Sequence, residues 1–384
     1  MMKRARDVTF FLALVGLLAI IPPGGFSAWT WTSGQRWIYI FFIAFFFCSL
    51  AVPLAAYAAR RLGAVDQPGP RRVHVYPTPR LGGLAVFLAL ALALLRNQQF
   101  SPLLLGIAAG AAIIFTLGFI DDVKSLRART RLFWQVAAAA VTAGAGLKLT
   151  FAQQLPGGDA LSFALTVIWL VGITNAFNFM DGIDGLAPAM GAVCSLLFVG
   201  IAWNSNQYEV AFLSAALAGA CSGFLTVNWH PARMFLGDGG STLIGFLLGC
   251  LAVYGSWATG NPAVALSTPL LVLGIPVFDL IYTTVSRIKN GQISTVKEWL
   301  EYTGRDHFHH RLMKLGLGVR QTVGFILLLN LCLGLGAWTV RHTASTTGTI
   351  FLLLQSVMIF AIVVVLMLLG RESTEEEKTR SGTR

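Results

Sequence analysis

The sequence predicts an all-α fold, a polytopic helical bundle embedded in a membrane. Hydrophobic residues make up 55% of the 384 residues and charged residues only 12%, whereas soluble domains carry about 25% charged residues. Long apolar stretches recur from Val8 to Gly370. Because lipid offers no partner for an exposed backbone group, segments that cross it are helical. This composition excludes an ordinary soluble protein of two or three domains.

We expect about 11–12 transmembrane helices, since a span needs about 20 residues. The candidate spans are residues 8–22, 37–58, 81–95, 102–120, 133–151, 161–177, 187–203, 210–228, 241–257, 265–286, 322–340 and 348–370. Two of them, 8–22 and 81–95, are short. The first follows three basic residues as a signal peptide would, but no small-residue cleavage site follows it, so we interpret it as an uncleaved span.

The chain divides on this basis into four parts. Residues 1–36 form an N-terminal span and outer loop, 37–340 a membrane-embedded core, 341–370 an additional C-terminal span, and 371–384 a polar tail. The tail is rich in Glu and Lys and is expected to be disordered.

The basic residues predict the orientation. With the N-terminus in the cytoplasm, 24 of the 28 Lys and Arg residues fall in inner segments, and the outer segments carry only Arg36, Arg96, Lys148 and Arg341. The positive-inside rule therefore places both termini in the cytoplasm. The net charge of +11 needs no nucleic-acid partner, because these cations face anionic membrane lipid.

The most informative stretch, Asn175–Leu186, ends an apolar run and carries two amides and two carboxylates. If the run continues as a helix, Asn175, Asn178, Asp181 and Asp184 are three apart and lie near one face. Such a face offers the oxygen ligands that Mg²⁺ prefers. The alternative is a pair of Asp-Gly turns, which would explain the carboxylates but not the asparagines.

Three further aspartates fall at predicted cytoplasmic ends of spans. Asp121 and Asp122 end a span, at the negative pole of the helix dipole, where each carboxylate is disfavoured by about 0.3–1 kcal/mol. They indicate either a metal or phosphate site or a solvated loop start neutralised by the following Lys and Arg. Asp238 lies in a glycine-rich turn before a span, where it either joins an anion site or, like Ser241, caps the helix. A bundle would gather these loops at one rim, so we expect one shared site on the cytoplasmic face.

Two basic loops complete the candidate site. One carries His307, His309, His310 and Arg311 behind Arg305, a cluster that suits phosphate, with a zinc site or an exposed basic loop as alternatives. The other contains the candidate substrate ligands His74 and Arg80, and its alternative is a stiff, positively charged linker. Asp279 lies inside a predicted span and indicates either a functional residue or structural pairing.

Together these motifs resemble those of the polyprenyl-phosphate N-acetylhexosamine-1-phosphate transferases, of the glycosyltransferase 4 type. The similarity covers roughly residues 37–340 and rests on four motifs in the same order: Asp121-Asp122, Asn175–Leu186, Gly237–Ser241 and the His-Phe-His-His stretch that begins at His307. The resemblance implies a bacterial inner-membrane enzyme that transfers a sugar-1-phosphate from a UDP-N-acetylhexosamine to undecaprenyl phosphate and releases UMP. It also implies Mg²⁺, with Mn²⁺ as an alternative, and a homodimer.

The resemblance also implies roles for the residues. Asp238 and Asp181 would bind the metal, and the catalytic carboxylates would be Asp121, Asp122, Asp181 and Asp184. The substrate ligands would be Asn175, Asn178, His74, Arg80, Arg305, His307, His309, His310 and Arg311. An acceptor phosphate is already largely ionised at neutral pH, which favours direct attack, although Asp122 as a base and a covalent aspartyl intermediate stay open.

Three functions remain to be distinguished. The His-Phe-His-His form is more similar to the subgroup that transfers N-acetylglucosamine-1-phosphate and primes a cell-envelope polysaccharide. The alternative is the phospho-N-acetylmuramoyl-pentapeptide branch, which shows three adjacent histidines before an acidic residue. A transporter is the remote alternative, because only Asp279 lies where transporters place polar sites.

Overall fold

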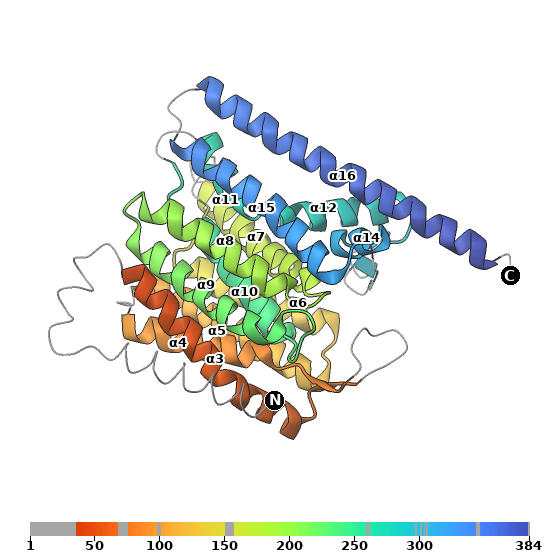
Figure 1. The fold of residues 1–384 in the computed structure, drawn as a ribbon. Helices are drawn as coiled ribbons and strands as arrows, with labels where there is room; N and C mark the ends of the chain where they lie inside the picture. The colour runs from red at the N-terminus through yellow and green to blue at the C-terminus, as the bar shows by residue number, and fades with distance from the viewer. Residues whose placement is uncertain are drawn as a thin grey trace. The chain divides into compact units, whose positions relative to one another are not determined.

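The computed structural model describes residues 36–67, 76–97, 101–149, 157–258, 262–295, 298–299, 302, 304, 306–342 and 346–382. This part of the chain is almost entirely α-helical, which confirms the predicted fold class (Figure 1). The predicted span 8–22 and the candidate ligands His74 and Arg305 lie outside the described residues.

Seven described helices are long and apolar enough to cross a membrane, and a bent pair would make an eighth. The chain is therefore a multi-pass membrane protein. The predicted spans 81–95 and 241–257 correspond to shorter apolar helices of 10–17 residues. The chain forms two compact units, Met1–Asn178 with Ala187–Gly255, and Phe179–Leu186 with Ser256–Arg384.

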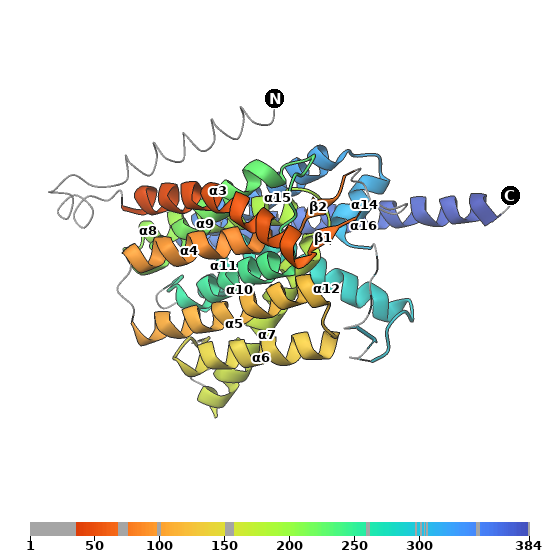
Figure 2. The same ribbon diagram turned by 90° about the horizontal axis from the view of Figure 1, so that it is seen from below.

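The first unit is a bundle of eight described helices. They are α3 (Arg36–Leu62), α4 (Gly82–Asn97), α5 (Pro102–Lys124), α6 (Ala128–Gly144), α7 (Gly158–Met180), α8 (Leu186–Trp203), α9 (Tyr208–Asn228) and α10 (Asp238–Tyr254). Helix α3 packs against α4 and α9, and α5 lies between α6 and α10 (Figure 2). Strands β1 (Val65–Asp66) and β2 (Thr78–Pro79) pair antiparallel after α3.

Glycines allow the backbones of α4 and α5 to touch the start of α10. A Cβ on Gly118 would lie 2.5 Å from Cα of Gly239, and one on Gly83 would lie 2.3 Å from the backbone nitrogen of Gly240. Real Cβ atoms do not approach other atoms so closely, and only glycine permits such backbone contact. These contacts bring the C-terminus of α5 to the N-terminus of α10.

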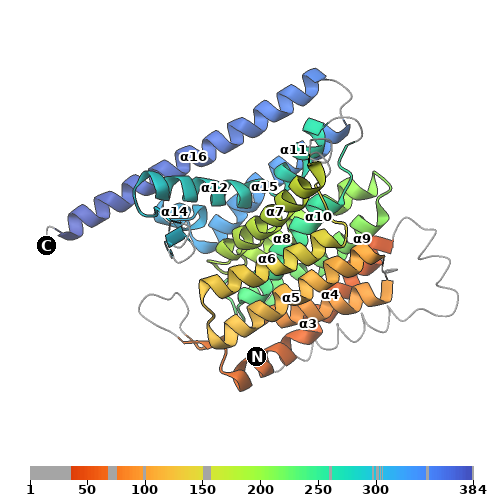
Figure 3. The same ribbon diagram turned by 180° about the vertical axis from the view of Figure 1, so that it is seen from behind.

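The second unit contains α11 (Pro262–Val272), α12 (Gly274–Lys289), α14 (Phe308–Lys314), α15 (Val319–His342) and α16 (Thr346–Gly382). Helix α15 packs against α11, α12 and α16, and the short α14 lies against α16 (Figure 3). The residues after 370, which we expected to be disordered, continue α16 to Gly382. Their Glu and Lys residues are good helix formers.

The single helix predicted for residues 265–286 is wrong, because α11 and α12 meet at an angle of 85°. Pro276 lacks the N–H that would bond back to Val272 in a continuous helix. Asn330 of α15 supplies the missing partners: its Nδ2 donates to the carbonyl of Val272 (3.1 Å), and its Oδ1 accepts from the N–H of Ile275 (3.4 Å). A buried break in a helix is tolerated when such side chains satisfy the backbone.

Candidate active site

Asp121 and Asp122 occupy the last turn of α5, and both are almost fully buried, at 6% and 5% exposed. One oxygen of Asp121 accepts from the backbone N–H of Leu126, and the other forms an ion pair with Nη1 of Arg131 at 3.0 Å. Because both carboxylates are buried, the alternative of a solvated loop start is wrong, but the neutralisation by a following arginine that it included is found at Asp121. The unfavourable position at the end of the helix is offset by the cation that α6 supplies.

Asp122 caps a different helix from the one it belongs to. Its two oxygens accept from the backbone N–H groups of Asp238 (2.9 Å) and Gly239 (3.0 Å) at the start of α10. These amides would otherwise lack partners. The alternative in which Asp238 or Ser241 caps α10 is therefore wrong. The cap position is held by Gly237, which has no side chain and a φ of +76°. The hydroxyl of Ser241 donates to the carbonyl of Gly237.

Arg80 supports the same arrangement from the chain segment before α4. Its Nε and Nη2 donate to the carbonyl of Asp122, at 3.1 and 2.7 Å. A cation at the carbonyl end of α5 complements the negative pole of the helix dipole. The substrate-binding role of Arg80 stays a prediction.

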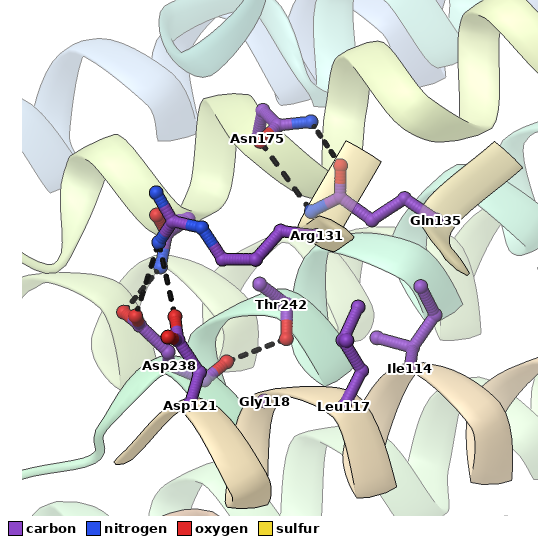
Figure 4. Close-up of a pocket in the computed structure, with 10 residues that line it drawn as sticks. Ile114, Leu117, Gly118, Asp121, Arg131, Gln135, Asn175, Asp238 and Thr242 are labelled. Atoms are coloured by element: carbon purple, nitrogen blue, oxygen red, sulfur yellow. Dashed lines mark hydrogen bonds and ion pairs between the residues drawn. The ribbon is translucent and has the colours of Figure 1, made fainter. Parts of the chain in front are cut away.

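Asp238 lies beside Asp121 and contacts the same guanidinium of Arg131. Its Oδ2 lies 3.4 Å from Nη1 of Arg131, the nitrogen that also contacts Asp121 (Figure 4). Its Oδ1 accepts from Nδ2 of Asn178 at 2.8 Å, and Asn178 also donates to the hydroxyl of Ser241. Two carboxylates thus converge on the same nitrogen of one guanidinium, whose charge offsets part of their mutual repulsion.

These groups line a pocket within the first unit. Asn175 forms its neutral edge and is paired with Gln135, whose Oε1 accepts from Nδ2 of Asn175 at 2.8 Å (Figure 4). The lining residues are Ile114, Leu117, Gly118, Asp121, Arg131, Gln135, Asn175, Asn178, Asp238 and Thr242. Neither Arg131 nor Gln135 was predicted as a site residue, although Arg131 is one of the basic residues that follow the aspartate pair. Their spacing of four residues, which puts both on one face of α6, is the signal that could have found them.

The helical register predicted for the Asn175–Leu186 block is only half right. Asn175 and Asn178 lie in α7 and line the pocket, but α7 ends at Met180. Asp181 and Asp184 lie in a turn that closes with Gly185 at φ of +81°. The prediction of one four-oxygen face is therefore wrong, because the Asp-Gly pairs form the turn that was its alternative.

This turn belongs to the second unit, where it packs on the histidine segment. A Cβ on Gly182 would lie 2.3 Å from Nε2 of His309, so only glycine leaves room for the ring. The catalytic roles of Asp181 and Asp184, and the metal-binding role of Asp181, stay predictions.

The histidine segment runs from His307 to Arg311 and begins α14. The His307 ring stacks on Phe179 at 5.0 Å, and the His309 ring lies nearly parallel to it at 6.1 Å and 4.2 Å from His310. Arg311 is buried and donates to the carbonyls of Asp306 (2.8 Å) and Met367 (2.5 Å). It therefore anchors α14 to α16, and its contact with a substrate stays a prediction.

His309 differs from its neighbours in lacking hydrogen-bond partners. It is 1% exposed, and among the residues that the structure describes neither ring nitrogen has a partner. Burial, together with the neighbouring His310 and His307, holds the pKa of His309 well below its usual value. An unsatisfied buried polar group is costly, and the described residues supply no partner to either nitrogen of this ring.

The pocket of the first unit has the donor set for a hard cation. Asp121 and Asp238 offer carboxylate oxygens around a position that one positive charge already occupies, and Asn178 adds an amide. In the described part of the chain, no three His, Cys, Asp or Glu residues are arranged to hold a metal by themselves. Mg²⁺ is typically held by one or two carboxylates together with water and substrate phosphates, so Asp121 and Asp238 are the residues that would hold it.

The fold and this pocket define a polytopic membrane protein whose oxygen-rich, cation-bridged site suits phosphate chemistry. Residues 104–256 match the family model of glycosyl transferase family 4. The chain is 31% identical over 346 residues to the probable undecaprenyl-phosphate N-acetylglucosaminyl 1-phosphate transferase of Bacillus subtilis, covering 88% of this chain and 92% of the relative.

Two other relatives place this similarity within the family. The decaprenyl-phosphate N-acetylglucosaminephosphotransferase of Mycobacterium tuberculosis is 32% identical over 349 residues, which cover 82% of this chain and 84% of the relative. The phospho-N-acetylmuramoyl-pentapeptide-transferase of Bacillus pumilus is 34% identical over 199 residues, but these cover only 46% of this chain and 60% of the relative. The chain belongs to glycosyl transferase family 4, as its motifs predicted.

Proposed function

We propose that this protein transfers N-acetylglucosamine-1-phosphate from UDP-N-acetylglucosamine to undecaprenyl phosphate and thereby primes a cell-envelope polysaccharide. The observation that carries the proposal is the pair Asp121 and Asp238, which share Arg131 in a pocket of a membrane-embedded unit. The relatives that match over most of their length support this donor, whereas the muramoyl-pentapeptide relative matches over a shorter part.

In the proposed reaction an oxygen of the acceptor phosphate attacks the phosphorus that carries the sugar. The bond from that phosphorus to the bridging oxygen breaks, and UMP leaves with the electron pair. The product is a polyprenyl diphosphate that carries the sugar. Phosphoryl transfer of this kind depends on positioning and on neutralising charge.

The pocket residues divide this work. Arg131 offers a guanidinium that neutralises phosphate oxygens and holds their geometry. Asn178 fixes the orientation of Asp238 through the bond at 2.8 Å. When Mg²⁺ or Mn²⁺ is bound at Asp121 and Asp238, it supplies the additional positive charge that stabilises the diphosphate in the transition state.

We assign Asp122 to positioning rather than to proton transfer. Both of its oxygens accept backbone N–H groups of α10, and they therefore maintain the place of Asp238. The acceptor phosphate has a second pKa near 6, so it is largely ionised at neutral pH and needs no general base. Direct in-line attack follows as the simplest route.

The setting of the enzyme is part of the proposal. The positive-inside distribution supports cytoplasmic termini in the bacterial inner membrane, where a UDP-sugar is accessible. A fluorescent-protein fusion at the C-terminus should fold and fluoresce, whereas a periplasmic alkaline phosphatase fusion should be inactive. Light scattering of the detergent-solubilised protein would test the proposed homodimer.

A donor panel tests the reaction. Purified protein with undecaprenyl phosphate and Mg²⁺ should release UMP from UDP-N-acetylglucosamine and not from UDP-N-acetylmuramoyl-pentapeptide. EDTA should abolish release, and Mg²⁺ or Mn²⁺ should restore it. Release with the pentapeptide donor alone would favour the other branch. Failure with every UDP-N-acetylhexosamine would overturn the proposal.

A further inference from the structure

Asp279 is a buried carboxylate of α12 that has no part in the reaction proposed above. It is 2% exposed, and a buried charge is costly unless it is paired and hydrogen-bonded. Its Oδ2 lies 2.7 Å from Nδ1 of His307, and its Oδ1 accepts from the backbone N–H of Phe308 at 2.8 Å. One side chain thus contacts both the first histidine of the segment and the first residue of α14.

The second nitrogen of His307 is also occupied. Nη2 of Arg287 lies 3.2 Å from Nε2 of His307, and a guanidinium can only donate. Nε2 therefore accepts, and Nδ1 carries the proton that it donates to Asp279. Arg287 is itself held by two bonds to Asp306, at 2.8 and 2.7 Å, and lies over the ring of Tyr302 at 4.4 Å.

His307 is consequently fixed in one tautomer and one orientation. Its ring stacks on Phe179 and is nearly parallel to the ring of His309. In the part of the chain that the structure describes, His309 is the histidine of this segment whose two ring nitrogens are buried and unpartnered. The fixed ring of His307 therefore sets the position of the nearly parallel His309 ring beside it.

We infer that Asp279 is a positioning residue: it holds His307 in the Nδ1–H tautomer and fixes the start of α14, so that His309 is presented to the phosphates of the nucleotide sugar. The effect on turnover rests on the proposed function, whereas the tautomer of His307 does not. In this inference His307 does not contact the substrate itself. It holds His309, which does.

The substitution Asp279→Asn tests this inference through hydrogen-bond chemistry. Phe308 N–H can only donate, so it requires the Asn oxygen, and the Asn amide group must then face Nδ1 of His307. That amide group donates, so His307 must move its proton to Nε2, where it opposes the donor from Arg287. The variant thus retains the shape of Asp279 but cannot satisfy both neighbours.

Nitrogen-15 NMR of histidine-labelled protein in detergent gives a readout that does not depend on activity. The signal that disappears in His307→Asn should show the Nδ1–H tautomer in the wild type, and it should change in Asp279→Asn. An Nε2–H tautomer in the wild type would overturn the inference, and so would an unchanged signal in Asp279→Asn. If no UDP-sugar supports turnover, this measurement still decides the tautomer.

Kinetics test the consequence for the substrate. In Asp279→Asn we expect KM for UDP-N-acetylglucosamine to rise about tenfold or more, as for loss of a hydrogen bond to a charged group, with a smaller change in kcat. His307→Asn should retain more activity than His307→Ala, because its amide nitrogen can reach the position of Nδ1 and keep the bond to Asp279. An equal loss in both His307 variants would contradict the role of this bond.

A matched control separates this role from a general loss of charge. Glu298→Gln removes a carboxylate of the same unit that bonds to Ser294 rather than to the histidines, and it should leave KM and the histidine signals unchanged. If Asp279→Asn does not fold, the His307→Asn and His307→Ala pair tests the same bond. A KM shift in Glu298→Gln as large as that in Asp279→Asn would overturn the inference.

Discussion

The carboxylate pocket of the first unit and the histidine segment of the second both gather ionisable side chains, but their electrostatics are opposite. In the pocket, Asp121 and Asp238 repel each other and are reconciled by the charge of Arg131. In the histidine segment, His307 is satisfied at both nitrogens, while His309 is buried with neither nitrogen bonded within the described residues. The pocket carboxylates thus share a cation that the protein supplies, whereas the described part of the histidine segment leaves one buried ring without a hydrogen-bond partner.

This difference follows from how each region is held in place. The pocket depends on backbone contacts, since Asp122 caps α10 and glycines bring α5 against it. The histidine segment depends on side-chain hydrogen bonds, since Asp279 and Arg287 each bond to one ring nitrogen of His307. Substitutions in the pocket should therefore mainly lower kcat, because they change its charge. Substitutions in the histidine segment should mainly raise KM for the UDP-sugar.

The largest effect is expected for Asp238→Asn. The change keeps the shape but removes one of the two charges that face Arg131, so kcat for UMP release should fall by at least about 10²–10³-fold, the scale of losing an electrostatic group at a transition state. Asp159→Asn is the matched control, because Asp159 is exposed and pairs with Lys148. A near-normal rate of Asp238→Asn at saturating Mg²⁺ would contradict the role of the pocket.

The sequence revealed the ligands of the pocket better than its architecture. The spacing of Asn175 and Asn178 and the buried Asp121-Asp122 pair were visible in the apolar pattern, because polar groups are conspicuous there. The bond from Asp122 to α10 joins residues more than a hundred positions apart, and no local pattern encodes it. Arg131 was hidden because a basic residue at an inner loop is expected from the positive-inside rule alone.

The same contrast applies to the fold. Hydropathy located the apolar segments, but it did not show that 265–286 bends at Leu273, between α11 and α12, since proline and glycine are common in membrane helices. The bend depends on Asn330 of another helix, which satisfies the freed backbone groups. Gly182 and Gly185 indicate the end of α7 at Met180. The three-residue spacing of Asn175, Asn178, Asp181 and Asp184 instead suggests that the helix continues.

A smaller effect, on affinity, is expected for Gly182→Ala. The added Cβ would lie 2.3 Å from Nε2 of His309, so the ring must move from its place in the stack. We expect KM for the UDP-sugar to rise about tenfold, the scale of a lost hydrogen bond of about 1.4 kcal/mol, while kcat changes less.

Gly172→Ala is the control for this substitution. Gly172 lies within α7, and a Cβ there meets no atom within 4 Å. Alanine in the middle of a helix stabilises it by roughly 0.5–1 kcal/mol relative to glycine, so this variant should unfold at the same or a higher temperature with unchanged KM. If both variants shift KM equally, the contact between Gly182 and His309 is not the cause.

The neutral state of buried His309 predicts a dependence of stability on pH. Its pKa is lowered chiefly by burial, so the unfolded chain binds a proton near pH 6.5 that the folded protein does not. The free energy of unfolding should therefore fall as the pH decreases below about 6.5, with a slope of up to about 1.4 kcal/mol per pH unit.

Thermal unfolding in detergent between pH 7.5 and 5 measures this slope. His309→Gln should reduce the dependence on pH, because the variant has no group to protonate at that position. Identical slopes in the wild type and His309→Gln would contradict a buried, neutral His309.

The smallest effect is expected at the neutral edge of the pocket. Gln135→Ala removes the amide pair with Asn175 (2.8 Å), which carries no net charge, so kcat/KM should fall only about 2–10-fold, as for a hydrogen bond of about 0.5–1.5 kcal/mol. In a double-mutant cycle with Asn175→Ala, the second substitution should cost little once the first is present, because the two side chains act as one unit. Additive losses would show that each amide meets the substrate separately. A loss as large as that of Asp238→Asn would show that Gln135 and Asn175 contribute as much to catalysis as the charged carboxylates. The distinction between a charged centre at Asp238 and a neutral edge would then fail.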